Sequence, residues 1–133
     1  MNERKDWAAL LGRILLALTF VTSGFGKLMA FAGTVGTIAG KGVPLPEVAA
    51  ALTILIELGG GLAIIAGWKT RWWALLIALF IVVITPIFHN YWAMPDPQKM
   101  MTNQIMFWKN VSMIGGFLVL FAFGPVRYSV DKR

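Results

Sequence analysis

Four long apolar runs, separated by short polar or glycine-rich segments, dominate the pattern of hydrophobic and polar positions along the chain. They cover approximately residues 7–31, 46–67, 72–88 and 102–123. Because about 17–25 apolar residues in a helix are enough to cross a bilayer, each run is a candidate membrane span. The pattern predicts an all-α protein, an integral membrane four-helix bundle that forms a single domain over residues 1–133.

The segments between the runs contain residues that interrupt helices. Residues 33–45 include four glycines and a proline, which indicates a loop or a re-entrant segment before Pro46 begins the second span. Residues 94–101 include two prolines and are also predicted to be a loop, and Pro86 is expected to kink the end of the third span. Within the second span, Gly59–Gly61 offer a small-residue surface on which another helix can approach closely.

The start of the chain imitates a signal peptide. Basic residues precede the first apolar run, and the run ends near Ala30-Phe31-Ala32, which resembles a small-residue cleavage site. The apolar run is long for such a signal, so we interpret it as a first membrane helix that is retained.

The composition supports a membrane protein and excludes several kinds of chemistry. Of the 133 residues 58% are hydrophobic and 14% are charged, whereas soluble domains carry about 25% charged residues, and the mean hydropathy is +0.72. The absence of cysteine excludes disulfides, thiol chemistry and cysteine-ligated metals. A single histidine cannot supply two axial haem ligands, and no other cluster of ligating residues is present, so no metal site is predicted.

The distribution of charge predicts an orientation rather than a polyanionic partner. The net charge of +6 comes from basic residues in short clusters between the apolar runs, which is not typical of a nucleic-acid-binding face. Two basic residues, Lys41 and Lys99, lie in the loops opposite the termini. Seven lie on the side of both termini: Arg4, Lys5, Lys69, Arg71, Arg127, Lys132 and Arg133. Both termini are therefore predicted to face the cytoplasm.

Glu57 lies near the middle of the second apolar run, roughly 16 Å along the helix from its start. A charge at that depth costs at least about 2.5 kcal/mol even on a lenient insertion scale. The carboxylate must therefore be paired, hydrogen-bonded or protonated. We expect it to lie within salt-bridge or one-water distance of Lys27 or Lys109.

The other three spans place polar residues at a similar depth, in the half of the bundle opposite the termini. Lys27 lies near the end of the first span, and His89 and Asn90 end the third. Lys109 and Asn110 lie about two turns into the fourth span. Polar groups from all four helices are therefore expected to converge on one region, together with the carboxylate of the second span.

Helical spacing supports this convergence, because residues four or seven positions apart share one face of a helix. The sets with such spacing are Thr19, Ser23 and Lys27 in the first span, Thr85 and His89 in the third, and Asn103 and Asn110 in the fourth. Arg13 points in a similar direction but lies near the boundary on the side of the termini. There it is expected to snorkel to water or lipid headgroups, outside the cluster.

Each of these residues also has a purely structural interpretation. Glu57 with a lysine can be an ion pair that only fixes the packing of the bundle, and Lys27 near a span end can simply snorkel. His89 can be an interfacial residue, and Asn110 can bond a neighbouring helix. The convergence instead favours a small polar pocket with apolar walls, for which the candidate residues are Lys27, Glu57, His89, Asn90, Lys109 and Asn110.

At these residues the chain resembles the DoxX family of small four-helix bacterial membrane proteins. One cue is Gly12-Arg13-Ile14-Leu15-Leu16 leading to Ser23-Gly24-Phe25-Gly26-Lys27, and another is Glu57 followed by Gly67 and a basic turn. The third is His89-Asn90-Tyr91-Trp92 with Phe107-Trp108-Lys109-Asn110 and Gly115-Gly116. The motifs cover nearly the whole chain, which looks most similar to an uncharacterised inner-membrane branch with a Trp-Lys-Asn motif.

The resemblance implies a four-helix membrane fold, a multi-pass protein of the bacterial inner (plasma) membrane, and several alternative roles. Members of the family are linked to quinone-coupled sulfur oxidation and to quinone or oxidative-stress responses, and distant eukaryotic relatives to cargo export or receptor assembly. Because this chain has no cysteine, the resemblance does not extend to an autonomous thiol-based oxidoreductase.

Three functions follow from these observations. The first is a membrane subunit of a redox or stress-response assembly whose pocket binds a small polar-headed molecule, a quinone being the candidate cofactor. Lys27, His89 and Lys109 would then bond the head, and Glu57 would balance charge or relay a proton. The second is a scaffold or assembly factor, acting with a protein partner or as a homo-oligomer, and the third is an oligomeric small-solute or proton transporter. In each case the surroundings are the lipid bilayer, and no nucleic acid is involved.

Overall fold

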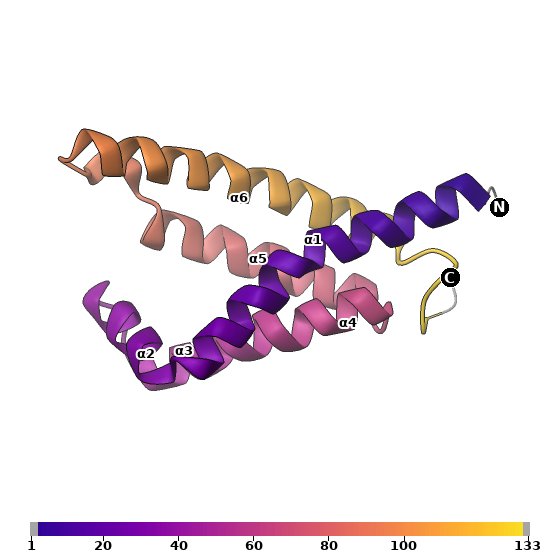
Figure 1. Ribbon diagram of the computed structural model, residues 1–133, viewed down its shortest axis with the longest axis horizontal. Coiled ribbons are helices and arrows are strands. Elements are labelled where there is room, and N and C mark those ends of the chain that lie inside the picture. Colours follow the sequence, from indigo (N-terminus) through magenta and orange to yellow (C-terminus); the bar gives the residue numbers. More distant parts are fainter. Residues whose placement is uncertain (1–2, 132–133) are drawn as a thin grey trace.

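The computed structural model, which describes residues 3–131, is built from helices (Figure 1). The helices are α1 (Glu3–Met29), α2 (Phe31–Gly40), α3 (Pro46–Ile54), the π-helical segment η1 (Leu55–Gly59), α4 (Gly60–Ala66), α5 (Thr70–Phe88), the 3₁₀ turn η2 (Tyr91–Ala93) and α6 (Pro97–Phe123). Within the described residues, four segments are long and apolar enough to cross a membrane: Glu3–Met29, Pro46–Ala66, Thr70–Ala93 and Pro97–Phe123. The predicted all-α fold with four membrane spans is confirmed.

The four spans form two pairs that meet along the length of the molecule. α1 crosses the second span along η1 and α4, α5 lies along α6, and α4 packs against α5 and so joins the two pairs. Both ends of the chain lie at the same end of the bundle, as four antiparallel spans require (Figure 1). That this end faces the cytoplasm stays a prediction from the charge distribution.

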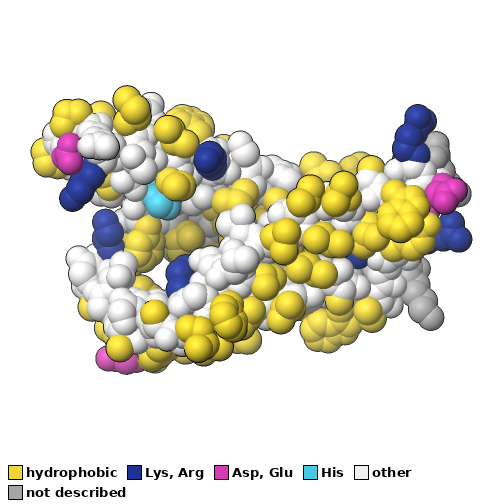
Figure 2. All heavy atoms as spheres, in the orientation of Figure 1, with side chains coloured by type: hydrophobic (Ala, Val, Ile, Leu, Met, Phe, Trp, Pro, Cys, Tyr) yellow, Lys and Arg dark blue, Asp and Glu magenta, His cyan; other side chains and the backbone are white. Residues whose placement is uncertain are grey.

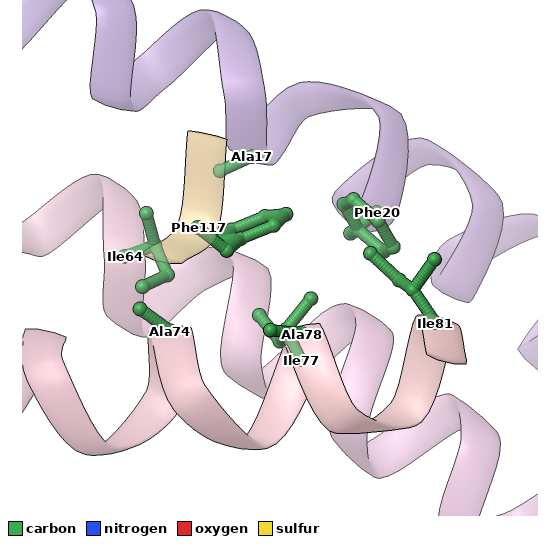
Figure 3. Close-up of a cluster of buried hydrophobic side chains, with 8 residues drawn as sticks. All are labelled: Ala17, Phe20, Ile64, Ala74, Ile77, Ala78, Ile81 and Phe117. Atoms are coloured by element: carbon green, nitrogen blue, oxygen red, sulfur yellow. The ribbon is translucent and has the colours of Figure 1, made fainter. Parts of the chain in front are cut away.

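A small apolar core with side chains from all four spans joins the two pairs (Figure 3). Phe117 of α6 is fully buried and packs edge-on against Phe20 of α1, with ring centroids 5.4 Å apart. Because lipid is as apolar as these side chains, the fit between them stabilises the bundle more than their transfer from water does. The cluster comprises Ala17, Phe20, Ile64, Ala74, Ile77, Ala78, Ile81 and Phe117.

Glycine allows α1 and the second span to approach closely. A Cβ atom on Gly24 would lie 2.6 Å from the backbone nitrogen of Leu58, and one on Gly61 would lie 2.7 Å from a side-chain carbon of Val21. Both distances are too short for real contacts, so neither position tolerates a side chain without movement of a helix. The small-residue surface predicted in the second span is confirmed at Gly61, which packs on α1, and at Gly60, which packs on α5.

Two segments that were not predicted as helices are partly helical: residues 33–45, predicted to be a loop or a re-entrant segment, and residues 94–101, predicted to be a loop. Residues 31–40 form α2, which follows α1 after a break at Ala30 and packs against α3. Its glycines lower helix stability by about 0.5–1 kcal/mol each relative to alanine, but they do not forbid a helix. α6 begins at Pro97 instead of residue 102, because Asp96 caps it by accepting a hydrogen bond from the backbone N–H of Gln98 at 3.1 Å. A proline in the first turn lacks only an N–H that has no helical partner.

The C-terminal tail closes the end of the bundle where both termini lie. Arg13 of α1 is 3% exposed, and its guanidinium donates to the carbonyl oxygens of Pro125 at 2.6 Å, Tyr128 at 2.6 Å and Ile65 at 3.1 Å. The expectation that Arg13 snorkels to water is therefore wrong. The tail folds back over the guanidinium and supplies acceptors that the hydropathy of the first span does not reveal.

The same tail caps α5. The carboxylate of Asp131 accepts hydrogen bonds from the backbone N–H groups of Lys69 at 2.8 Å and Thr70 at 2.9 Å. These are N–H groups at the start of the helix that have no partner within it. Lys132 and Arg133, which count in the predicted charge bias, lie outside the described residues.

Candidate functional site

Glu57 lies within the π-helical segment η1, midway along the second span, and is 3% exposed. A π turn holds one residue more than an α turn and so changes the direction of the side chains around it, and such turns are frequent at functional sites. The hydrophobic pattern gives no sign of this segment, because Leu55–Gly59 has the composition of an ordinary apolar helix. In this position the carboxylate faces α1.

Two side chains one turn apart on α1 hold this carboxylate. Lys27 Nζ donates to Glu57 Oε1 at 2.9 Å and Oε2 at 3.0 Å, and Ser23 Oγ donates to Oε1 at 3.0 Å. The pairing expected with Lys27 or Lys109 is thus confirmed with Lys27. The two partners differ in burial, since the side chain of Glu57 is 4% exposed and that of Lys27 is 34% exposed. The lysine therefore stands between a buried carboxylate and open space.

Two side-chain contacts connect α5, and His89 directly after its last residue, to α6 on the faces expected from the spacing. Asn110 Nδ2 donates to Thr85 Oγ1 at 3.0 Å, and His89 Nδ1 lies 2.9 Å from Asn103 Oδ1. The two residues on each helix share one face, as their separations of four and seven positions require. These contacts fix the position of α6 along α5 and hold the imidazole of His89 in one orientation.

A cavity of about 550 Å³ opens between the ends of α1, α2, α3 and α5. Figure 2 shows it as the hollow between two arms of the molecule, at the end opposite the termini. Lys27 and His89 line it with charged and imidazole groups, and its hydroxyl groups come from Thr34, Thr37 and Thr53. Its apolar walls include Ile38, Phe80, Ile84 and Phe88.

The structure brings together some of the residues predicted to form a pocket. Lys27 and His89 line the cavity, and Glu57 lies directly behind Lys27. Asn110 lies at the α5–α6 contact through its bond to Thr85. Asn90 is half-buried next to η2, where its carbonyl oxygen accepts a hydrogen bond from the backbone N–H of Ala93.

Lys109 is not brought to this cavity. It is exposed on the outward face of α6, where it lines a separate shallow hollow of about 450 Å³ with Gln104, Trp108 and Ser112. Successive residues of a helix point about 100° apart, so the orientation of Asn110 toward α5 turns Lys109 away from it. The prediction that both residues reach one pocket therefore conflicts with the geometry of a single helix.

The threonines and aromatic residues of the cavity were missed from the sequence. Thr34 and Thr37 belong to α2, which was expected to be a loop or a re-entrant segment, and so their side chains had no predicted direction. A signal was nevertheless present, because Thr34, Thr37 and Ile38 are three and four positions apart and share one face once residues 31–40 are taken as a helix. Phe80, Ile84 and Phe88 follow the same four-residue spacing on α5.

The family model named DoxX matches residues 8–90, a range that contains every residue lining the cavity. The chain belongs to the DoxX family. It is 40% identical to the inner membrane protein YqjF of Escherichia coli (strain K12), over 99% of this chain and 95% of that protein. It is 39% identical to the inner membrane protein YphA of the same organism, over 93% of this chain and 88% of that protein. With four helices able to cross a membrane, this DoxX protein is a multi-pass inner-membrane protein.

A more distant similarity reaches eukaryotic proteins. The Surfeit locus protein 4 homolog of Drosophila melanogaster is 25% identical over 99% of this chain, which corresponds to 43% of that longer protein. No solved structure matches the chain.

Proposed function

We propose that the cavity binds a small, membrane-dissolved molecule with a flat apolar body and an oxygen-bearing polar head. A quinone has both features and is the ligand class that we propose, with the protein acting as a membrane subunit of a redox or stress-response assembly. The observation that carries the proposal is the position of Lys27 and His89 on a cavity whose other walls are largely apolar.

The size and walls of the cavity suit such a ligand. Its volume of about 550 Å³ lies within the range of roughly 300–1,000 Å³ that is typical of ligand pockets. Phe80 and Phe88 offer ring faces and edges against which an aromatic or quinonoid ring can pack, and Ile84 lies between them in sequence on the same helix.

The ion pair behind the cavity prepares Lys27 for a neutral ligand. An ammonium group has three N–H donors, and Lys27 directs two of them at the oxygens of Glu57. The third remains for an oxygen of the head group. Because Glu57 already balances the positive charge, the site can bind an uncharged carbonyl or hydroxyl without leaving a lone buried charge.

The proposal is tested by native mass spectrometry of the protein purified in mild detergent, with added 1,4-naphthoquinone as the probe. Ile84→Trp places a large side chain in the cavity, whereas Val83→Trp puts the same side chain on an adjacent position that is 60% exposed. We expect the wild type and Val83→Trp to retain the probe, and Ile84→Trp to lose it by at least tenfold. Equal retention by both variants, or no binding by the wild type, would overturn the proposal.

A second function, as a scaffold for another membrane protein or for a second copy of the chain, is favoured by one observation. Within α6, which the structure describes in full, Phe117 is the one fully buried residue, and Lys109, Gln104 and Ser112 face outward. Polar side chains on the outside of a membrane helix commonly bond another helix. Chemical cross-linking in native membranes tests this role, because Lys109→Leu should then remove a cross-linked species that the wild type forms.

A further inference from the structure

The hydroxyl groups of the cavity that have a bond in the structure donate their protons to backbone carbonyl oxygens. Thr34 Oγ1 donates to the carbonyl oxygens of Ala30 at 3.1 Å and Lys27 at 3.3 Å, and Thr37 Oγ1 donates to that of Gly33 at 3.0 Å. A hydroxyl whose proton is used in this way can still accept hydrogen bonds through its oxygen. Toward a ligand, these two threonines are therefore acceptors.

The hydrogen bonds of Asn103 fix the tautomer of His89. Asn103 Nδ2 donates to the carbonyl oxygen of Lys99 at 2.9 Å, which places the amide oxygen, an acceptor, toward the imidazole. The 2.9 Å contact from His89 Nδ1 to that oxygen then requires a proton on Nδ1. In neutral histidine the other nitrogen, Nε2, is left with a lone pair and is an acceptor.

The cavity thus offers more hydrogen-bond acceptors than donors. Among the hydrogen bonds of residues 3–131, none uses His89 Nε2 or the Thr53 hydroxyl, so the donors that remain are the third N–H of Lys27 and the O–H of Thr53. Because acceptors outnumber donors, a complementary head group must bring hydrogens of its own. It must also offer one oxygen with a lone pair to Lys27.

We infer that this cavity selects the hydroxyl-bearing, reduced form of its ligand: a hydroquinone or related phenol, with one O–H donated to His89 Nε2 and one oxygen accepting from Lys27. The inference rests on the proposed function and adds the redox state that the site prefers. An oxidised quinone presents only carbonyl oxygens, so one of them would face the lone pair of Nε2 with no proton between them. Leaving such a group unpaired corresponds to a preference for the reduced form on the order of 10- to 100-fold.

The preference is measured with three matched probes in detergent under anaerobic conditions, by equilibrium dialysis. They are 1,4-naphthohydroquinone, which carries two O–H groups, 1,4-naphthoquinone, which has none, and 1,4-dimethoxynaphthalene, which keeps the oxygens but replaces their protons by methyl groups. We expect the hydroquinone to bind 10- to 100-fold more tightly than either of the others. A quinone that binds as tightly as the hydroquinone, or more tightly, overturns the inference and leaves the binding function standing. Failure of all three probes to bind overturns both.

Three substitutions separate the role of Nε2 from a structural role of His89. His89→Asn keeps a donor for Asn103 at the place of Nδ1 but removes the group at the place of Nε2, so the preference for hydroquinone should disappear. His89→Gln puts an amide oxygen near the place of Nε2 and should retain part of the preference for hydroquinone. Asn103→Leu frees the imidazole to carry its proton on Nε2, which then donates to a carbonyl, so the preference should shrink below about threefold or reverse. An unchanged preference in His89→Asn or in Asn103→Leu would refute the assignment.

Discussion

The Lys27–Glu57 pair should respond unequally to removal of its two partners. Lys27→Met leaves a carboxylate that is 4% exposed, with the Ser23 hydroxyl as its remaining donor in the described structure. Removal of one partner from a buried ion pair typically costs about 3–5 kcal/mol of unfolding free energy. Glu57→Gln leaves a lysine that is 34% exposed beside a cavity large enough for water. A glutamine oxygen can still accept from it, so we expect a loss of only about 1–2 kcal/mol.

The double variant Lys27→Met, Glu57→Gln completes the cycle. It has no charge at the site of the pair and nearly the same volume, so it should be about 2 kcal/mol more stable than the sum of the two single losses predicts. Unfolding in mixed micelles with increasing sodium dodecyl sulfate, followed by circular dichroism, measures all four proteins. Strict additivity, or a larger loss for Glu57→Gln than for Lys27→Met, would refute the idea that the difference in burial governs the pair.

Three further predictions concern other parts of the bundle. Arg13→Lys cannot reproduce a planar fork that reaches three carbonyl oxygens, so we expect a loss of about 2–4 kcal/mol and faster tryptic cleavage after the exposed Arg127. Gly24→Ala should cost about 1–3 kcal/mol because its Cβ would meet backbone, whereas Gly26→Ala on the same helix has open space and should be neutral or slightly stabilising in the same unfolding assay. A reporter that is active only in the cytoplasm should be active when fused after Arg133. Activity of a reporter that works only in the periplasm would contradict the orientation predicted from the charges.

The hydrophobic pattern was sufficient for the spans and for the need of Glu57 for a lysine partner, though not for the choice between Lys27 and Lys109, because the spans and this need both follow from the cost of polar groups in lipid. The depth of Glu57 demanded a partner, and the four-residue spacing of Ser23 and Lys27 put two donors on one face of the neighbouring helix. The contacts of α5 with α6 followed from the same reasoning at Asn103 and Asn110. In each case local periodicity and a large energetic penalty led to the same result.

The burial of Arg13, the π-helical turn, α2 and the cavity depended on information that local sequence patterns do not carry. Arg13 is bonded by Pro125 and Tyr128, which lie 112 and 115 positions further along the chain, so its burial is a property of the tertiary fold. The π-helical turn at Glu57 is a small change in backbone geometry with no composition of its own. α2 was not predicted because its glycines weaken a helix, although they do not prevent one. The cavity was not predicted either, because Thr34 and Thr37, which line it, lie on that helix.

The bonds of Arg13 also impose an order on the biosynthesis of the protein. The chain emerges from the ribosome with α1 first, when the three carbonyl groups that later receive the guanidinium have not yet been synthesised. In that interval water, lipid headgroups or the insertion machinery must solvate the arginine, against a cost that approaches about 2.5–3.5 kcal/mol toward the centre of a membrane helix. The first helix can take its final depth only after residues 125–128 have emerged. A nascent chain arrested before that point should therefore hold its first helix in the membrane more loosely than the finished protein does.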